Sequence, residues 1–253
     1  MRSTGLILAR SARTIAETID ICLMPLAAIN FGYLKGRTYF EEKFPRRLEE
    51  RTADIPSASV QDPAPAVAAQ ALQGLTFAHE EPSLEDMYLH LLATSMDGRL
   101  PQDAAHPAFV EVIRQMTALE ATLVKDVFLK YEMQPIVQLR KKITLRNSPR
   151  NGSHTVALRY LFDLRSEGAA VEVDGFGAMI DNLIRLGLIV VNYDRQMTAP
   201  GAYSWADSRP ETERLRKGCD SSFESIEVRP GTMEPTEFGY RFARAVGIQP
   251  HSL

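Results

Sequence analysis

Cysteine is almost absent from this chain of 253 residues, in which only Cys22 and Cys219 occur. So few cysteines, so far apart, are typical of a reducing compartment and exclude a disulfide scaffold. The chain also lacks an excess of charge of either sign, because its formal net charge is only −3. A balance this close to zero gives no overall attraction to nucleic acid or acidic lipid. We therefore expect a cytoplasmic protein.

Long apolar runs are missing as well. Arg10, Arg13, Glu17 and Asp20 interrupt the N-terminal region, whereas a secretory signal needs one continuous apolar core. The uncharged run 21–34 has 14 residues, which is short of the roughly 20 that cross a bilayer as a helix. This run predicts a buried or interfacial helix, so a peripheral place on the inner membrane is the alternative to a purely cytoplasmic one.

The motifs of common enzymes do not occur in the sequence. It contains no G-x-S-x-G, H-E-x-x-H, P-loop or C-x-x-C pattern, and its five histidines have no metal-ligand spacing. The segment "GFGAM" at Gly175 lacks the third glycine of a dinucleotide-binding turn. We therefore predict that the chain is not an enzyme and has no catalytic residues, cofactor or metal site.

The residues that are present predict a packed core, since 45% are hydrophobic and 24% are charged. Prolines and small residues mark one linker, and helical periodicity resumes after it. The linker is expected to let the preceding helix detach without unfolding the helices that follow. The expected order is an N-terminal apolar or amphipathic helical segment (1–50), a Pro-rich linker (51–66), a helical region (67–132) and a winged-helix-like region (133–253) with a polar loop (195–222).

The stretch "LLATSMDGRLPQDAAHPAFVEVIRQMT", residues 91–117, carries several polar side chains that suggest an active site. A catalytic pair of Ser95 and His106 is one interpretation. The other is structural: Gly98 ends one helix, His106 and a following proline start the next, and Thr117 begins a capping box with Glu120. We favour the structural interpretation, because the polar residues coincide with helix ends.

Apolar spacing predicts which side chains these helices bury. A second capping box is expected at Ser83 and Asp86. The expected core positions are Val67, Ala71, Leu75, Ala78, Leu84, Met87, Tyr88, Leu91, Leu92, Phe109, Val110, Ile113 and Met116.

The C-terminal half has the order of elements of a winged helix. We expect helices at His154–Arg165 and Gly175–Leu188, a two-stranded ribbon from "IVVNY" and "FESIEVRPG", and a last helix from Thr236. The predicted fold class is therefore mainly α, a helical bundle with a C-terminal winged-helix-like region that contains a small β-ribbon.

Charge argues against duplex DNA as a partner of this region. Residues 101–253 contain equal numbers of acidic and basic residues, whereas DNA affinity depends on neutralising phosphates. One basic patch stands out: Arg140, Lys141, Lys142, Arg146 and Arg150. It is interpreted either as a solvated hairpin edge that resists aggregation or as a patch for nucleic acid or lipid headgroups.

Several segments resemble the Abi-alpha family of bacterial abortive-infection proteins. They are "LEDMYLHLLATSMDGR", "AHPAFVEVIRQMTALEATLV", "DNLIRLGLI" and "EPTEFGYRF", and the similarity extends over about 67–242. The resemblance implies phage defence, in which an infected bacterium limits phage spread at its own expense. It brings no catalytic residues with it.

The N-terminal segment carries the remaining candidate surface. Its apolar face consists of Ile19, Cys22, Leu23, Leu26, Ile29, Tyr33 and Leu34. Residues 1–40 contain five bases and two acids, a polarity that suits anionic lipid. We expect residues 15–34 to be buried on the protein body or in a homo-oligomer.

Three functions follow from these patterns. The first is a non-enzymatic anti-phage protein that acts as a sensor or effector through contacts with a protein partner or a second copy. The second is a membrane-perturbing effector that uses residues 15–34. The third is a winged-helix transcription regulator.

Overall fold

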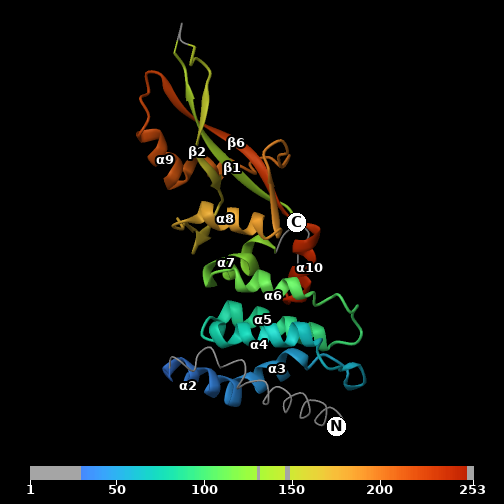
Figure 1. Cartoon of the computed structure of the whole chain (residues 1–253). Helices are drawn as coiled ribbons and strands as arrows, with labels where there is room; N and C mark the ends of the chain where they lie inside the picture. Colours follow the sequence, from blue (N-terminus) through green and yellow to red (C-terminus); the bar gives the residue numbers. More distant parts are fainter. Residues whose placement is uncertain (1–29, 130–131, 146–148, 250–253) are drawn as a thin grey trace. The chain divides into compact units, whose positions relative to one another are not determined.

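The computed structural model describes residues 30–129, 132–145 and 149–249 (Figure 1). The described chain divides into two compact units, with the boundary after Tyr240, inside helix α10 (Glu237–Ala245). We call residues 30–129 and 241–249 the helical unit, and residues 132–145 and 149–240 the sheet unit.

Helices make up most of the helical unit. Figure 1 shows α4 and α5 side by side, with α3 on one side of this pair and α6 on the other. The elements are α2 (Asn30–Thr38), the π-helix η2 (Tyr39–Lys43), α3 (Phe44–Thr52), the short 3₁₀-helix η3 (Ser57–Ser59), α4 (Pro65–Ala78), α5 (Pro82–Met96), α6 (Pro107–Arg114), α7 (Ala118–Leu123) and the π-helix η4 (Val124–Phe128).

Local sequence explains where these helices begin. Proline occupies the first position of α4, α5 and α6. Proline is tolerated there because the N–H of a first helical residue makes no hydrogen bond within the helix. His106 caps α6, because its Nδ1 accepts a hydrogen bond from the N–H of Ala108 at 3.1 Å. Thr117 and Glu120 form the predicted capping box, with N···O distances of 2.7 and 3.2 Å. Both predicted helix starts are confirmed.

The capping box predicted at Ser83 and Asp86 is wrong. Helix α5 begins at Pro82, with Glu81 as its N-cap, two residues before the predicted cap, so both residues lie inside its first turns. The hydroxyl of Ser83 pairs with that of Thr122 at 2.8 Å, and Asp86 binds cations from other helices. The predicted core positions of α4, α5 and α6 are all buried, as the helical spacing indicated.

The Pro-rich segment between α3 and α4 is tied to the end of α5. Val60 forms an isolated antiparallel bridge with Asp97. The N–H of Gln61 donates to the carbonyl of Met96 at 2.9 Å, and that of Gly98 donates to the carbonyl of Ser59 at 2.8 Å. The predicted Pro-rich linker is therefore anchored to the end of α5 at these residues.

The sheet unit is built on a four-stranded antiparallel sheet in the order β2-β1-β6-β5. Its central strand β1 pairs on both sides, so that Val137 lies opposite Leu161 on β2 and Pro230 on β6. The strands are β1 (Gln134–Ile143), β2 (His154–Leu161), β5 (Ile189–Asn192) and β6 (Glu224–Pro235), with a small hairpin of β3 (Arg165–Ser166) and β4 (Ala169–Ala170).

Three helical segments accompany this sheet: α8 (Phe176–Arg185), the 3₁₀-helix η5 (Ser204–Ser208) and α9 (Pro210–Lys217). The last two lie within the segment predicted as a polar loop, 195–222. Ala206 of η5 joins Val137, Leu139 and Leu161 in the core, and Trp205 packs against this cluster. One face of the sheet therefore carries an apolar core.

The sheet overturns the predicted fold class. The chain is mixed α and β, with 19% strand, and is not mainly α. The helix expected at His154–Arg165 is strand β2, which pairs with β1, so the predicted two-stranded ribbon of β5 and β6 is half of a larger sheet. The physical reason is that β1, between β2 and β6, pairs with residues 154–161 of this segment. The winged-helix arrangement is therefore wrong.

Candidate functional site

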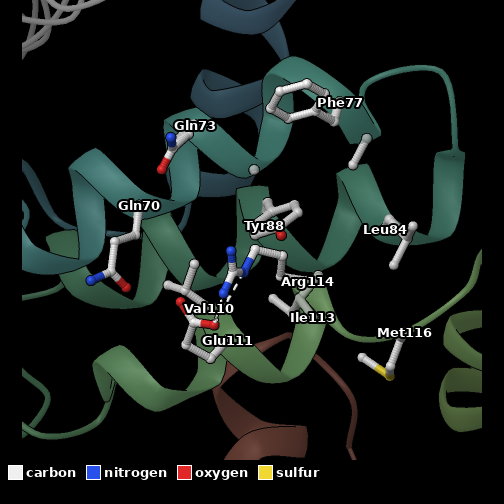
Figure 2. Close-up of a pocket in the computed structure, with 12 residues that line it drawn as sticks. Gln70, Gln73, Phe77, Leu84, Tyr88, Val110, Glu111, Ile113, Arg114 and Met116 are labelled. Carbon is white, nitrogen blue, oxygen red and sulfur yellow. Dashed lines mark hydrogen bonds and ion pairs between the residues drawn. The ribbon is translucent and has the colours of Figure 1, made fainter. Parts of the chain in front are cut away.

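A groove of about 370 Å³ lies between α4, α5 and α6 of the helical unit (Figure 2). Its apolar lining comes from all three helices and from Met116, two residues beyond the end of α6. The amides of Gln70 and Gln73 lie along the α4 side (Figure 2). The main apolar lining residues are Leu84, Val110, Ile113 and Met116.

Gly74 and Tyr88 determine the shape of the groove. A Cβ atom at Gly74 would lie 2.4 Å from both Cζ and Oη of Tyr88, far inside van der Waals contact, so α4 approaches the phenol through a glycine. Tyr88 is only 2% exposed, and this burial raises the pKa of its hydroxyl to about 12. The ring therefore forms a neutral, fixed part of the groove wall.

The rim of the groove carries an exposed aromatic side chain. Phe77, one turn of α4 beyond Gln73, is 59% exposed. Figure 2 shows its ring at one end of the groove. On the α6 side, the Oε2 atom of Glu111 accepts a hydrogen bond from Nη2 of Arg114 at 2.5 Å. Both partners of this pair are exposed, so the pair contributes little to stability and both side chains are accessible to a partner.

On the side of α5 away from the groove, the buried carboxylate of Asp86 binds side chains from two other helices. Asp86 binds Nη2 of Arg51 from α3 at 2.5 Å and Nζ of Lys125 from η4 at 2.6 Å. The imidazole of His90 stands 3.7 Å from the same carboxylate. Burial opposes ionisation, but the hydrogen bonds from Lys125 and Arg51 outweigh it and hold the pKa of Asp86 below its usual value. This cluster fixes α5 to α3 and η4, and so fixes one wall of the groove.

His90 belongs to the same cluster but remains poorly protonated. Burial lowers the pKa of its imidazole, and the neighbouring Asp86 carboxylate offsets only part of this effect. The ring also packs against Gly247, where an added Cβ would lie 2.6 Å from Nδ1. Neutral imidazole is therefore the form that fits this site.

The predicted N-terminal face lies largely outside the described residues. Ile19, Cys22, Leu23, Leu26 and Ile29 all fall there, and the side chain of Tyr33 is not described either. Leu34 is the one member of the face with a described side chain, and it is 57% exposed.

The helical arm that follows Leu34 is packed into the fold. Tyr39, Phe40, Phe44 and Leu48 are buried, and the rings of Phe40 and Phe44 lie 5.3 Å apart. Ion pairs add to this packing, because Arg47 lies 3.3 Å from Glu85 and Arg51 binds Asp86. Release of residues 39–52 would expose four large apolar side chains, so detachment of this described part is unfavourable.

Two residues of the predicted basic patch form ion pairs with acidic neighbours. Lys141 pairs with Glu224 at 3.0 Å, and Lys142 pairs with Glu227 at 2.7 Å. Arg140 donates to the side-chain oxygen of Gln138 at 2.6 Å. Arg150 is exposed in the turn between β1 and β2, and Arg146 lies outside the described residues.

The strand pairing bears on the interpretation of these bases as a solvated hairpin edge. β1 is an interior strand, so Arg140, Lys141 and Lys142 do not line a sheet edge; β2 is the edge strand of the hairpin. Glu224 and Glu227 of β6 pair with Lys141 and Lys142. This arrangement does not form the acid-free surface that the sequence suggested.

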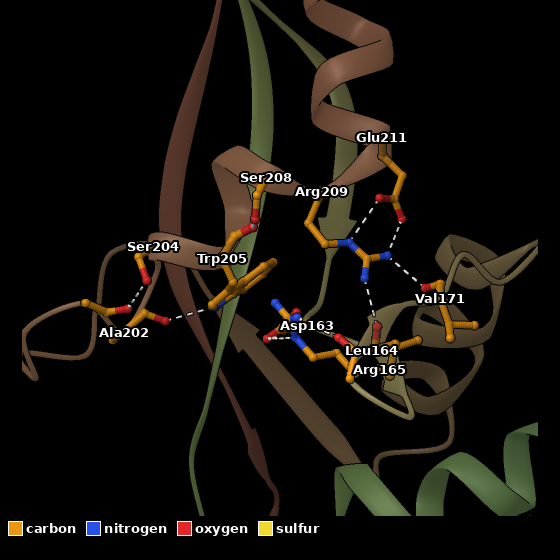
Figure 3. Close-up of polar contacts among 12 residues, drawn as sticks. Asp163, Leu164, Arg165, Val171, Ala202, Ser204, Trp205, Ser208, Arg209 and Glu211 are labelled. Carbon is orange, nitrogen blue, oxygen red and sulfur yellow. Dashed lines mark hydrogen bonds and ion pairs between the residues drawn. The ribbon is translucent and has the colours of Figure 1, made fainter.

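The sheet unit contains one strongly buried arginine (Figure 3). Arg209 is 2% exposed, and it donates to the carbonyls of Leu164 and Val171, each at 2.8 Å. Its Nε and Nη2 also bind the carboxylate of Glu211 at 3.0 and 2.6 Å. Arg209 lines a cleft of about 270 Å³, but its bonds go to groups of the protein itself. It joins the start of α9 to the β3–β4 segment and has a structural role.

Ser95 and His106 do not form a catalytic pair in this structure. The Ser95 hydroxyl donates to the carbonyl of Leu92 at 2.9 Å, and His106 caps α6. Within the described ranges, no group of three or more His, Cys, Asp or Glu side chains could hold a metal ion. Among the same residues, no helix has both the length and the apolar character needed to cross a membrane.

Sequence reasoning identified the buried residues of the groove but missed the groove itself. Leu84, Tyr88, Val110, Ile113 and Met116 were expected only as core. The available signal was Gly74, a glycine inside a helical pattern, which often marks a close approach of another element. Phe77, next to it on α4, gave no periodic signal because it lies off the buried face.

Of the three comparisons with known proteins, one found a match, to a family model. Neither the curated proteins nor the solved structures contain a match to this chain. The family model described as abortive infection alpha matches residues 36–246, which include every groove residue named above and all of the sheet unit. The chain therefore belongs to the abortive infection alpha family.

Proposed function

We propose that this chain acts in abortive infection as a binding protein rather than as an enzyme, through protein contacts made by the groove between α4, α5 and α6. The observation that carries the proposal is an exposed phenyl ring, that of Phe77, beside an apolar groove. Aromatic side chains that fill pockets supply much of the energy of protein interfaces. Abortive infection would then depend on whether this surface is occupied.

The test is phage protection in cells that express single variants. Phe77→Asp places a charge on the groove rim, and Leu119→Asp is the matched control, because Leu119 is also exposed but does not line the groove. We expect Phe77→Asp to lose protection and Leu119→Asp to keep it, at equal protein levels. Full protection by Phe77→Asp would contradict a role for the groove.

The non-enzymatic part of the proposal has its own test. Ser95→Ala removes the hydroxyl that a catalytic pair with His106 would require, and we expect protection to remain. Because this hydroxyl bonds to the carbonyl of Leu92 in its own helix, the loss of stability should be small. Loss of protection at a normal protein level would restore the enzyme hypothesis.

A membrane-perturbing effector is the second candidate, and the exposure of Leu34 favours it. Leu34 ends the uncharged run 21–34 and is 57% exposed, so the described end of this run presents an apolar side chain to solvent. The test is flotation of the full chain with vesicles of phosphatidylcholine, with and without phosphatidylglycerol. We expect binding only to the anionic vesicles, and its loss in Leu23→Asp; absence of binding to both would remove this candidate.

A further inference from the structure

The groove face carries both a protruding ring and the hollow that would receive one. Phe77 lines the rim and is 59% exposed, so it does not fill its own groove. A cavity of about 150 Å³ is enough to hold a benzene ring. The groove of about 370 Å³ therefore has room for a phenyl group from another molecule.

The charges on the same face are balanced. Glu111 and Arg114 are the charged residues among those that line the groove, and they pair with each other. A face of this kind offers no attraction to a strongly acidic or strongly basic partner. It is complementary to itself, because Glu111 of one molecule can meet Arg114 of another while the reverse contact forms at the same time.

From these two features we infer that the partner of the groove is a second copy of this chain. In a two-fold symmetric contact the same patch is used on both subunits, so each contact occurs twice. Phe77 of each copy enters the groove of the other, between α4 and α6, and the two acid–base pairs exchange partners across the axis. This inference rests on the proposed function of the groove and names its occupant.

Sedimentation velocity of the full chain over a range of concentrations tests the inference. The wild-type chain should show a monomer–dimer equilibrium. Phe77→Asp should raise the dissociation constant of the dimer by about 30-fold or more, the loss typical of a central aromatic contact. Leu119→Asp is the matched control and should leave the constant within a few-fold of the wild type.

Exchanging the charges gives a sharper test. If these side chains only stabilised the fold, mixing the two variants would not restore a dimer. Arg114→Glu leaves two acids at the groove, and Glu111→Arg leaves two bases, so each variant alone should dimerise poorly. An equimolar mixture of the two should form a mixed dimer, because both acid–base contacts are then restored. Circular dichroism confirms that each variant is folded, which we expect since both positions are exposed.

The outcomes separate this inference from the proposed function. A wild-type chain that stays monomeric, or a mixture that does not restore the dimer, overturns the second copy as partner. If Phe77→Asp also abolishes protection in that case, the groove functions through a different protein. Conversely, a groove-dependent dimer whose disruption leaves protection intact supports the inference and refutes the proposed function.

Discussion

Replacing Gly74 by alanine would test the close approach of α4 to Tyr88. In an open helix interior, alanine is more stable than glycine by about 1 kcal/mol. At Gly74 the new Cβ would lie 2.4 Å from Cζ and Oη of a tyrosine that is 2% exposed. Overpacking of this kind typically costs about 1–3 kcal/mol. We therefore expect Gly74→Ala to lower the free energy of unfolding by up to about 2 kcal/mol, since the clash exceeds the helix-propensity gain.

Two probes separate the units in a urea titration. Far-UV circular dichroism follows mainly the helical unit, and the fluorescence of Trp205, the single tryptophan, follows the sheet unit. Gly177→Ala in α8 is the control, because a Cβ there meets nothing within 4 Å. It should stabilise the sheet unit by up to about 1 kcal/mol, while Gly74→Ala destabilises the helical unit.

A second substitution checks the cause. In a Tyr88→Leu background the clash is removed, so Gly74→Ala should become neutral or stabilising. If Gly74→Ala stabilises the otherwise wild-type chain by about 1 kcal/mol, as it would on an open helix, then α4 and α5 do not meet through this glycine, and the shape of the groove described above is wrong.

Other substitutions test the packing and the charges of the helical unit. Phe109→Ala should cost about 3–5 kcal/mol in urea unfolding, because a fully buried ring is lost; a cost below about 1 kcal/mol would contradict its burial. Asp86→Asn should destabilise the chain by about 1–3 kcal/mol by leaving Lys125 without its charged acceptor, and Lys125→Met should be less harmful than Asp86→Asn because Lys125 is more exposed. Acidification should lower stability from about pH 6.5, the unperturbed His value, because the pKa of His90 is depressed in the folded state and the unfolded state then binds more protons; His90→Gln should flatten this part of the profile. Thr117→Ala should cost about 1 kcal/mol through loss of the capping hydrogen bond, and an unchanged unfolding midpoint would show that the cap contributes nothing.

Local sequence signals determined the helical unit to a large extent. Helix starts at His106 and Thr117 follow from side chains that bond to the nearest backbone N–H groups, so residues two or three positions apart decide them. The buried faces of α4, α5 and α6 follow from a period that any helix imposes. The family resemblance rests partly on the same helices, and the family match confirms it.

Only the tertiary structure decided the sheet and the groove. β2 has few buried residues of its own, and its strand state depends on pairing with β1, which in turn pairs with β6 about ninety residues away along the chain. Lys141 and Lys142 of β1 form ion pairs for the same reason, because Glu224 and Glu227 reach them only through that pairing. The groove likewise exists because Gly74 and Tyr88, on different helices, come into contact. Contacts between residues far apart in sequence leave no local periodic signal, so the three-dimensional packing alone determines them.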